Sequence, residues 1–230
     1  PDDPFLLLNH AGRLDDVLTL AHELGHALHF HDANVCRPLN YWPGTALAET
    51  ASNFGELLLH EELLRRWTDA PRRRQLLHRF VVDGCNSALS QAAYVRFERA
   101  AHAERAAGVV SDERFSALWL DEMTALYGDR VQIRESERWR WVTIPHFVFA
   151  RFYCYSYAFG RLLTHALHRA WRTQGAAFVP AYRALLASGG SASPAQVLAP
   201  FGVDLADPAL WQQAFEPLEA ALAELEGLTP

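Results

Sequence analysis

The first clear pattern in the chain is a set of apolar residues at three- and four-residue steps between positions 14 and 31. Such steps place side chains on one face of an α-helix, because the helix turns by about 100° per residue. The residues on this face are Leu14, Val17, Leu18, Ala21, Leu24, Gly25 and Leu28. The pattern predicts an amphipathic helix over 14–31 with one buried side.

Helical patterns recur along the rest of the chain, separated by short segments rich in helix breakers. A loop is expected at "ANVCRPLNYWPGT", where two prolines and a glycine oppose regular structure. Further helices are expected at about 46–67, 72–107 with an interruption near Asp83-Gly84, 111–127, 149–173, 176–188, 194–201 and 207–225. Ser111 and Gly128 should begin and end the 111–127 helix. The segment "GDRVQIRESERWRWVTIP" has the alternation of a loop or a short strand.

These elements predict a mostly α fold, with residues 1–230 in one domain and no internal repeat or linker. The composition fits that of a globular protein, since half of the residues are hydrophobic and 21% are charged. A formal net charge of −6 argues against nucleic acid as a partner, because binding phosphates requires a basic surface.

Cysteine content and hydropathy bear on where the protein works. Cys36, Cys85 and Cys154 are far apart and form no CxxC pair, which favours reduced thiols in a cytoplasmic protein and excludes them as zinc ligands. The most apolar run, "FVFARFYCYSYAF", is too short to span a membrane and contains Arg151. No signal peptide is visible, and a start at Pro1 suggests that residues before it are missing.

The candidate chemistry begins with "HELGH" inside the first predicted helix. His22 and His26 are four residues apart, so they lie about 40° apart on one helical face, one turn from each other. Two imidazoles in this arrangement can bind one Zn²⁺. Glu23 is offset by one residue, where it can flank the ion and take a proton from the bound water. The surrounding apolar stripe favours a buried site over a chance surface pattern.

A third ligand is needed, because catalytic zinc sites usually have three protein ligands and one open position. His29 shares the face but lies about 10 Å of helical rise from His22, too far along a straight helix. A metzincin arrangement would need glycine at position 29 and histidine at 32, and this chain has His29 and Asp32. His29, His31 and His10 are interpreted as packing, supporting or cleft residues.

The next helix offers the remaining ligand. Glu49 lies on its first turns, 23 residues after His26, which allows a loop and an antiparallel return. Ser52, Asn53 and Glu56 share its face and could hydrogen-bond the ligands from behind. Glu61 and Glu62 are interpreted as a solvated charged end.

A peptidase mechanism follows from such a site. The ion would activate water, Glu23 would act as general base, and the oxyanion would need further donors. Polar donors occur in "IPHFVFARFYCYSYAFG", where His146, Tyr153, Tyr155 and Tyr157 interrupt an apolar segment. Buried hydroxyl groups need partners, so these side chains are candidates, while the phenylalanines are interpreted as core.

The stretches "LLLNHAGRLDDVLTLAHELGHALH", "LAETASNFGELLL", "IPHFVFARFYCYSYAFG" and "GVDLADPALW" together resemble the C-terminal catalytic part of the oligoendopeptidase F enzymes in the thimet oligopeptidase family. The resemblance follows the chain order over nearly all of the sequence. It implies a zincin-like helical catalytic domain beside a deep channel, one Zn²⁺, and cleavage of short peptides. Because family members have a large helical region before this part, the resemblance also implies either that residues 1–230 are the C-terminal fragment of a longer chain or that another polypeptide supplies the missing wall of the channel.

Carried over residue by residue, the resemblance implies zinc binding by His22, His26 and Glu49, with Glu23 as the general base. It implies that His146 and tyrosines of "FYCYSY" stabilise the transition state, with Tyr157 as the first candidate and Tyr153 as the second. Two competing hypotheses are an inactive zinc-containing module that binds peptides, and a purely structural helical protein. Retention of Glu23 argues against the first, because binding alone does not require this carboxylate.

Overall fold

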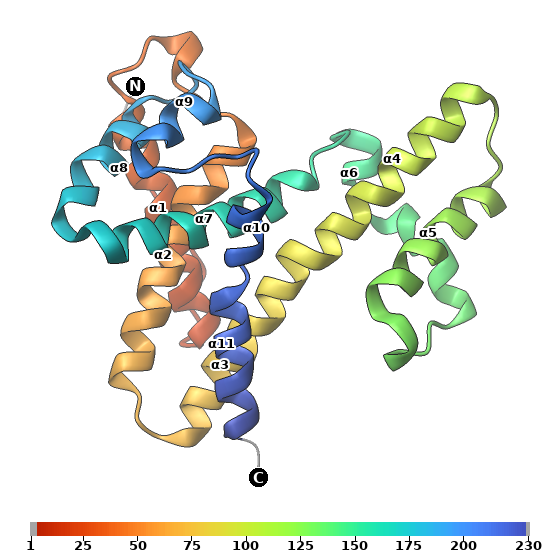
Figure 1. Ribbon diagram of the computed structural model, residues 1–230, viewed down its shortest axis with the longest axis horizontal. Coiled ribbons are helices and arrows are strands. Elements are labelled where there is room, and N and C mark those ends of the chain that lie inside the picture. The colour runs from red at the N-terminus through yellow and green to blue at the C-terminus, as the bar shows by residue number, and fades with distance from the viewer. Residues whose placement is uncertain (1–3, 229–230) are drawn as a thin grey trace. The chain divides into compact units, whose positions relative to one another are not determined.

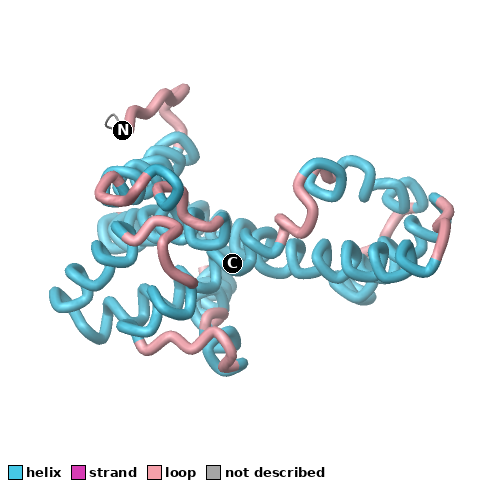
Figure 2. Tube along the Cα trace, turned by 90° about the horizontal axis from the view of Figure 1, so that it is seen from above, coloured by secondary structure: helices cyan, strands magenta, loops and turns pink. Residues whose placement is uncertain are grey.

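The computed structural model describes residues 4–228, and this part of the chain is helical (Figure 1). No strand occurs among the described residues, and loops join the helices (Figure 2). The mostly α fold class predicted from the periodicity is therefore confirmed. The chain forms two compact units, one of residues 1–83 with 159–230 and one of residues 84–158. That residues 1–230 act as a single catalytic domain stays a prediction.

Most of the helices belong to the larger unit. They are α1 (Leu14–Ala33), α2 (Thr45–Arg66), α3 (Ala70–Cys85), α7 (Tyr155–Gln174), α8 (Phe178–Ala187), α9 (Pro194–Leu198), α10 (Pro208–Gln213) and α11 (Glu216–Gly227), of which α3 and α7 continue into the other unit. Short 3₁₀ turns stand at η1 (Pro38–Asn40), η5 (Gly175–Ala177) and η6 (Ala199–Phe201). The helices predicted at 14–31, 46–67, 176–188 and 194–201 are confirmed within a few residues.

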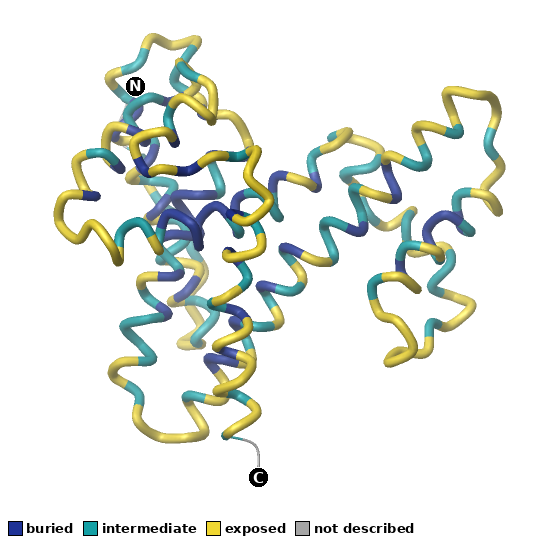
Figure 3. The backbone as a smooth tube through the Cα atoms, viewed as in Figure 1, coloured by how far each residue is buried: buried dark blue, intermediate teal, exposed yellow. Residues whose placement is uncertain are grey.

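The main core of the larger unit lies between α2, α7 and the helices that follow α7. Buried residues are nearly continuous along α7 from Gly160 to Leu167, as the dark stretch of tube shows (Figure 3). The cluster consists of Leu47, Ala51, Phe54, Leu163, Ala166, Leu167, Phe178, Tyr182, Leu185, Leu186, Leu198, Phe201, Val203 and Leu210. This packing fixes α2, which carries Glu49, against the rest of the unit.

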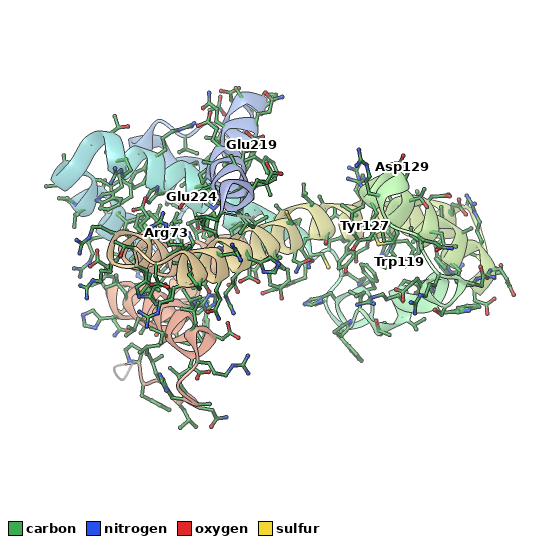
Figure 4. All side chains as sticks on the ribbon, turned by 90° about the horizontal axis from the view of Figure 1, so that it is seen from below. Arg73, Trp119, Tyr127, Asp129, Glu219 and Glu224 are labelled. Carbon is green, nitrogen blue, oxygen red and sulfur yellow. The ribbon has the colours of Figure 1, made fainter. Side chains whose placement is uncertain are left out.

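A second, smaller core joins α3 to α11. Leu77 and Phe80 of α3 pack with Leu218 and Ala221 of α11 and with Leu57 of α2. At the edge of this contact, Arg73 Nε donates to Glu224 Oε1 at 3.0 Å, and the two side chains point toward each other in Figure 4. The C-terminal helix is thus tied to the unit by both apolar and charged contacts.

The unit of residues 84–158 is built around α4 and α5. It contains a π-helical turn η2 (Asn86–Ser90), α4 (Gln91–Ala107), α5 (Asp112–Tyr127), 3₁₀ turns η3 (Gly128–Arg130) and η4 (Glu135–Thr143), and α6 (His146–Phe149). Its core consists of Ala93, Phe97, Leu118, Trp119 and Met123. Trp119, labelled in Figure 4, donates its indole N–H to the Glu137 carbonyl at 3.0 Å, which anchors η4 on α5.

The cap predictions for α5 are confirmed, but the segment after it is not a strand. The Ser111 side chain accepts from the Arg114 N–H, and Gly128 ends α5 with a φ of 60°. Residues 135–143 form a 3₁₀ helix, in which side chains three apart share a face. Arg138 pairs with Glu135 at 2.7 Å across this spacing, a contact that fits the helical turn and not the two-residue alternation of a strand.

Three other helix predictions were wrong in detail. The interruption expected near Asp83-Gly84 occurs two residues later, at the π-helical turn Asn86–Ser90 between α3 and α4. Gly84 itself is buried within α3, so packing offsets the weak helix propensity of glycine. The helix expected at 149–173 is interrupted between Phe149 and Tyr155. The helix expected at 207–225 is two helices, α10 and α11, with Pro217 in the first turn of α11. No helix in the described range is both long and apolar enough to span a membrane.

Candidate metal centre and catalytic groups

Helices α1 and α2 bring the predicted ligands together inside the larger unit. One donor atom each from His22, His26 and Glu49 lies within 4.8 Å of the other two. Glu49 Oε2 is 3.7 Å from His22 Nε2 and 3.9 Å from His26 Nε2. The side chains are 20–25% exposed, so the cluster is open on one side.

The geometry of these atoms fits a single metal ion. Both Nε2–Oε2 distances exceed the limit for a hydrogen bond, although the atoms converge. Donors held about 2.0–2.1 Å from a tetrahedral zinc ion lie roughly 3.3–3.4 Å apart. The two His–Glu separations are only slightly larger, and all three donor atoms lie within 4.8 Å of one another, so a modest movement of the side chains lets them share one ion. No other group of this kind is found among the described residues.

Glu56 supports His22 from behind. His22 Nδ1 lies 2.8 Å from Glu56 Oε1, and a carboxylate only accepts hydrogen bonds, so Nδ1 is the donor. The proton on Nδ1 leaves the lone pair on Nε2, the nitrogen that faces Glu49. The buried Arg161 of α7 lies 3.6 Å from the other Glu56 oxygen and holds this carboxylate in place.

The two imidazoles differ in their affinity for protons. Burial works to lower the pKa of His22, but its hydrogen bond to Glu56 and the charges of Glu56, Glu49 and Glu23 together raise this pKa above the ordinary value. Burial lowers the pKa of His26, and the charge of His22 lowers it further. His26 is therefore readily neutral and can offer a nitrogen lone pair to a metal ion. For His22, the surrounding negative charge favours the protonated form and holds the ring in place.

Glu23 lies close to this cluster. Glu23 is half-buried, and its charge works to raise the pKa of both His22 and His26, although burial still leaves the pKa of His26 lowered. It is not in the group of convergent donor atoms. Its role as the base stays a prediction.

Two glycines set the close approach of α1 and α2. A Cβ atom on Gly25 would lie 2.4 Å from the Ala51 carbonyl oxygen, and one on Gly55 would lie 2.5 Å from the Ala21 carbonyl oxygen. Real Cβ atoms are essentially never found that close to another atom. Glycine at both positions therefore lets the backbones touch, which brings Glu49 of α2 within reach of the imidazoles on α1.

The other histidines of α1 and the acidic residues further along α2 have other surroundings. His29 is buried, which lowers its pKa to about 4, and it is outside the convergent group. Asp32 is buried and pairs with Arg183 of α8. Glu61 pairs with His168 at 3.0 Å, and Glu62 is hydrogen-bonded to two arginines in solvent, as expected for a charged helix end.

The predicted polar donors gather in the unit of residues 84–158. His146 Nε2 and the Tyr157 hydroxyl are 3.2 Å apart. The Tyr153 ring stacks on His146 with centroids 5.4 Å apart, and it meets the Tyr157 ring edge-on. Tyr155 is more exposed than either tyrosine and is outside this group. The three side chains form one cluster, here called the donor cluster (His146, Tyr153 and Tyr157).

Sequence reasoning missed several residues that shape these sites. Gly25 was counted only as part of the apolar stripe, and Gly55 was not singled out in the second helix. Glycine inside a helix is nevertheless a recognised mark of close packing. Arg161 lies far from the motif, and no sequence signal pairs it with Glu56.

Comparison with known proteins places this arrangement in context. A family model described as "Peptidase family M3" matches residues 1–217. The chain is 33% identical over 227 residues to the plasmid oligoendopeptidase F of Lactococcus lactis subsp. cremoris, covering 97% of this chain and 37% of the relative. It is 29% identical over 228 residues to oligopeptidase PepF of Bacillus subtilis, covering 98% of this chain and 34% of that protein.

Solved structures agree with this result. A crystal structure from Chlamydophila abortus superposes with a TM-score of 0.87 at 27% identity, over 99% of this chain and 38% of that one. The oligoendopeptidase-F structure from Enterococcus faecium gives 0.81 at 29% identity, over 94% and 39%. The chain thus spans a little over a third of the length of the curated relatives and structures that it matches.

Proposed function

Because the chain belongs to peptidase family M3, we propose that it carries the catalytic centre of a zinc-dependent endopeptidase that hydrolyses short peptides. His22, His26 and Glu49 hold the ion in this proposal. The observation that carries it is the convergence of their donor atoms, with Glu56 holding the proton on the far nitrogen of His22. The printed names of the relatives, oligoendopeptidase F and oligopeptidase PepF, support a peptide substrate.

Each residue has a distinct chemical task in the proposed reaction. Bound zinc supplies Lewis-acid activation of a water molecule and of the scissile carbonyl. Glu23 accepts a proton from the attacking water and later passes it to the nitrogen of the leaving amine. The donor cluster supplies hydrogen bonds from His146 and Tyr157 to the oxyanion that forms on the carbonyl oxygen.

The relatives suggest how much protein the reaction needs. They are more than twice as long as this chain. We propose that the remaining length of the relatives forms a wall of the peptide channel. For this chain, the corresponding wall would come from the same or another polypeptide. A quenched peptide assayed with this chain and with a longer one tests this idea, and equal rates from both would reject it.

The central experiment separates metal binding from catalysis. Glu23→Gln should keep one zinc per chain but lower the rate of peptide hydrolysis by at least a hundredfold, because the amide cannot accept the water proton. His22→Ala should lose the zinc itself. Glu62→Gln is the matched control, since Glu62 is hydrogen-bonded only to arginines in solvent and should leave both properties unchanged.

Three outcomes would contradict the proposal. Hydrolysis by Glu23→Gln at the wild-type rate would reject Glu23 as the base. Zinc binding without hydrolysis by the wild-type chain in its longest form would favour a peptide-binding module. Absence of stoichiometric zinc from wild-type protein would leave His22 and His26 as structural residues.

A further inference from the structure

A buried carboxylate lies beneath the loop that carries the donor cluster. Glu98 of α4 is only 2% exposed. Its Oε1 atom accepts a hydrogen bond of 2.8 Å from the backbone N–H of Phe152. Its Oε2 atom is buried and has no hydrogen-bond partner. Burial of a carboxylate is costly, and leaving one oxygen unpaired adds to that cost, so this residue needs an explanation beyond packing.

The backbone at Phe152 is also strained. Phe152 has a φ of 59° and is the one residue other than glycine with a positive φ in the described part of the chain. A bulky side chain rarely adopts this conformation unless its surroundings impose it. The Phe152 ring packs on His102, with centroids 4.8 Å apart. The strained residue is therefore held on α4 through both its backbone and its side chain.

This turn separates α6 from α7 and orients the donor cluster. His146 begins α6, whereas Tyr153 directly follows the strained residue and Tyr157 lies in the first turn of α7. The Tyr153 N–H donates to the Ala150 carbonyl at 3.0 Å, and this hydrogen bond connects the loop to the end of α6. A rotation at Phe152 would carry Tyr153 with it and would change the start of α7.

The surroundings of Glu98 strengthen its hold on the loop. Glu98 lines a pocket of about 170 Å³ whose lining is mostly apolar, including Phe97, Trp141 and Phe147, with His102 and Arg105 as its other polar side chains. A hydrogen bond in apolar surroundings is stronger than one in water. Burial, and to a smaller extent the charge of Glu98, raises the pKa of the Cys154 thiol to about 11.

We propose that Glu98 is a positioning residue: by accepting the Phe152 N–H, it holds the left-handed turn that orients Tyr153, Tyr157 and His146 as oxyanion donors. The inference rests on the proposed function for its catalytic consequence. The anchoring itself rests only on contacts among residues 84–158.

Two conservative variants separate the hydrogen bond from the charge. Glu98→Gln keeps an oxygen acceptor at the same reach but has no charge. Glu98→Asp keeps the charge but withdraws the acceptor by about 1.5 Å, one carbon–carbon bond. We expect Glu98→Gln to retain kcat within threefold. Glu98→Asp should lower kcat at least tenfold with KM within twofold and with one zinc per chain retained. Glu104→Asp on the same helix, exposed and paired with Arg114, is the control.

A second readout does not depend on peptidase activity. Hydrogen exchange of the Phe152 amide should become at least tenfold faster in Glu98→Asp and stay near the wild-type rate in Glu98→Gln. The NMR signals of the Tyr153 and Tyr157 rings should shift in Glu98→Asp alone, and circular dichroism verifies the fold of each variant. If the wild-type protein hydrolyses no peptide, the proposed function fails while these measurements still decide the anchoring.

The opposite pattern would overturn the proposal. Loss of kcat and protection in Glu98→Gln, with both retained in Glu98→Asp, would assign the effect to charge. Wild-type exchange and kcat in both variants would show that the turn holds itself. A misfolded Glu98→Asp would leave Glu98→Gln to decide, since unfolding or lost activity in that variant would also reject hydrogen-bond anchoring.

Discussion

The crossing of α1 and α2 depends on Gly25, and Gly25→Ala tests whether that crossing builds the metal centre. The added methyl group would lie 2.4 Å from the Ala51 carbonyl oxygen and 2.6 Å from the Ser52 Cα atom. Both are backbone atoms of α2, so no side chain can rotate away. The helices must therefore separate by at least about 0.6 Å to reach the 3.0 Å that real Cβ contacts require.

This displacement acts directly on the ligand set. Glu49 is on α2 and the two imidazoles are on α1, and their donor atoms are already 3.7 and 3.9 Å apart. Functional sites tolerate a misplacement of about 0.5 Å. We expect zinc affinity to fall at least tenfold, which corresponds to about 1.4 kcal/mol. The stability of the metal-free protein should fall by up to about 2.5 kcal/mol, because about 1–3 kcal/mol of overpacking is only partly offset by about 0.5–1 kcal/mol of reduced backbone entropy.

The assay is competition for zinc against a chelator, combined with thermal unfolding of the metal-free protein. Gly227→Ala is the matched control. Gly227 is helical like Gly25, but it is exposed, and a Cβ atom added there would meet nothing within 4 Å. It should leave zinc affinity unchanged and raise stability slightly. Wild-type zinc affinity in Gly25→Ala would refute the argument that the tight crossing assembles the site.

Three further predictions follow from other contacts. Glu56→Ala should weaken zinc binding by about 10–100-fold in the same competition assay, because His22 loses the acceptor that fixes its orientation. Arg183→Ala should lower the free energy of unfolding by about 2–3 kcal/mol in urea titrations, because it leaves the buried Asp32 unpaired. Burial lowers the pKa of His60 and of His165 to about 4, so the unfolded chain binds more protons between pH 6.5 and 4. Stability should therefore fall by about 2 kcal/mol per histidine from pH 7 to pH 5, and a slope unaffected by His60→Phe would contradict this.

The periodic parts of the fold could be predicted from sequence because burial leaves a repeating mark. The stripe from Leu14 to Leu28 predicts α1 within two residues of its end, but not its buried side, because Val17, Leu24 and Leu28 of that stripe are exposed. Local signals also suffice at α5. The Ser111 side chain caps the start of the helix, and Gly128 ends it because glycine can adopt the required backbone conformation. In each case the signal lies in residues that are close along the chain.

Elements set by tertiary contacts could not be predicted in this way. The break before Tyr155 lies in an apolar segment without proline or glycine, and it contains a left-handed Phe152 whose N–H is bound by Glu98, 54 residues away. Gly84 has the sequence character of a helix breaker, yet it is buried inside a helix. Sequence patterns report the conformational preferences of short segments. At these positions the conformation is set by contacts with residues that are distant along the chain.

The candidate metal centre likewise has a part that the sequence predicts and a part that depends on tertiary contacts. His22, Glu23 and His26 are set by spacing on one helix, and the sequence is enough to group them. Glu49 could be proposed because it begins the next helix, but its distance from the imidazoles is set by the crossing at Gly25 and Gly55. In a helix, glycine is a cost unless something needs the space that its missing side chain leaves. Two glycines on the facing sides of successive helices are therefore physical evidence of contact, and they indicate where a ligand on the second helix can reach the first.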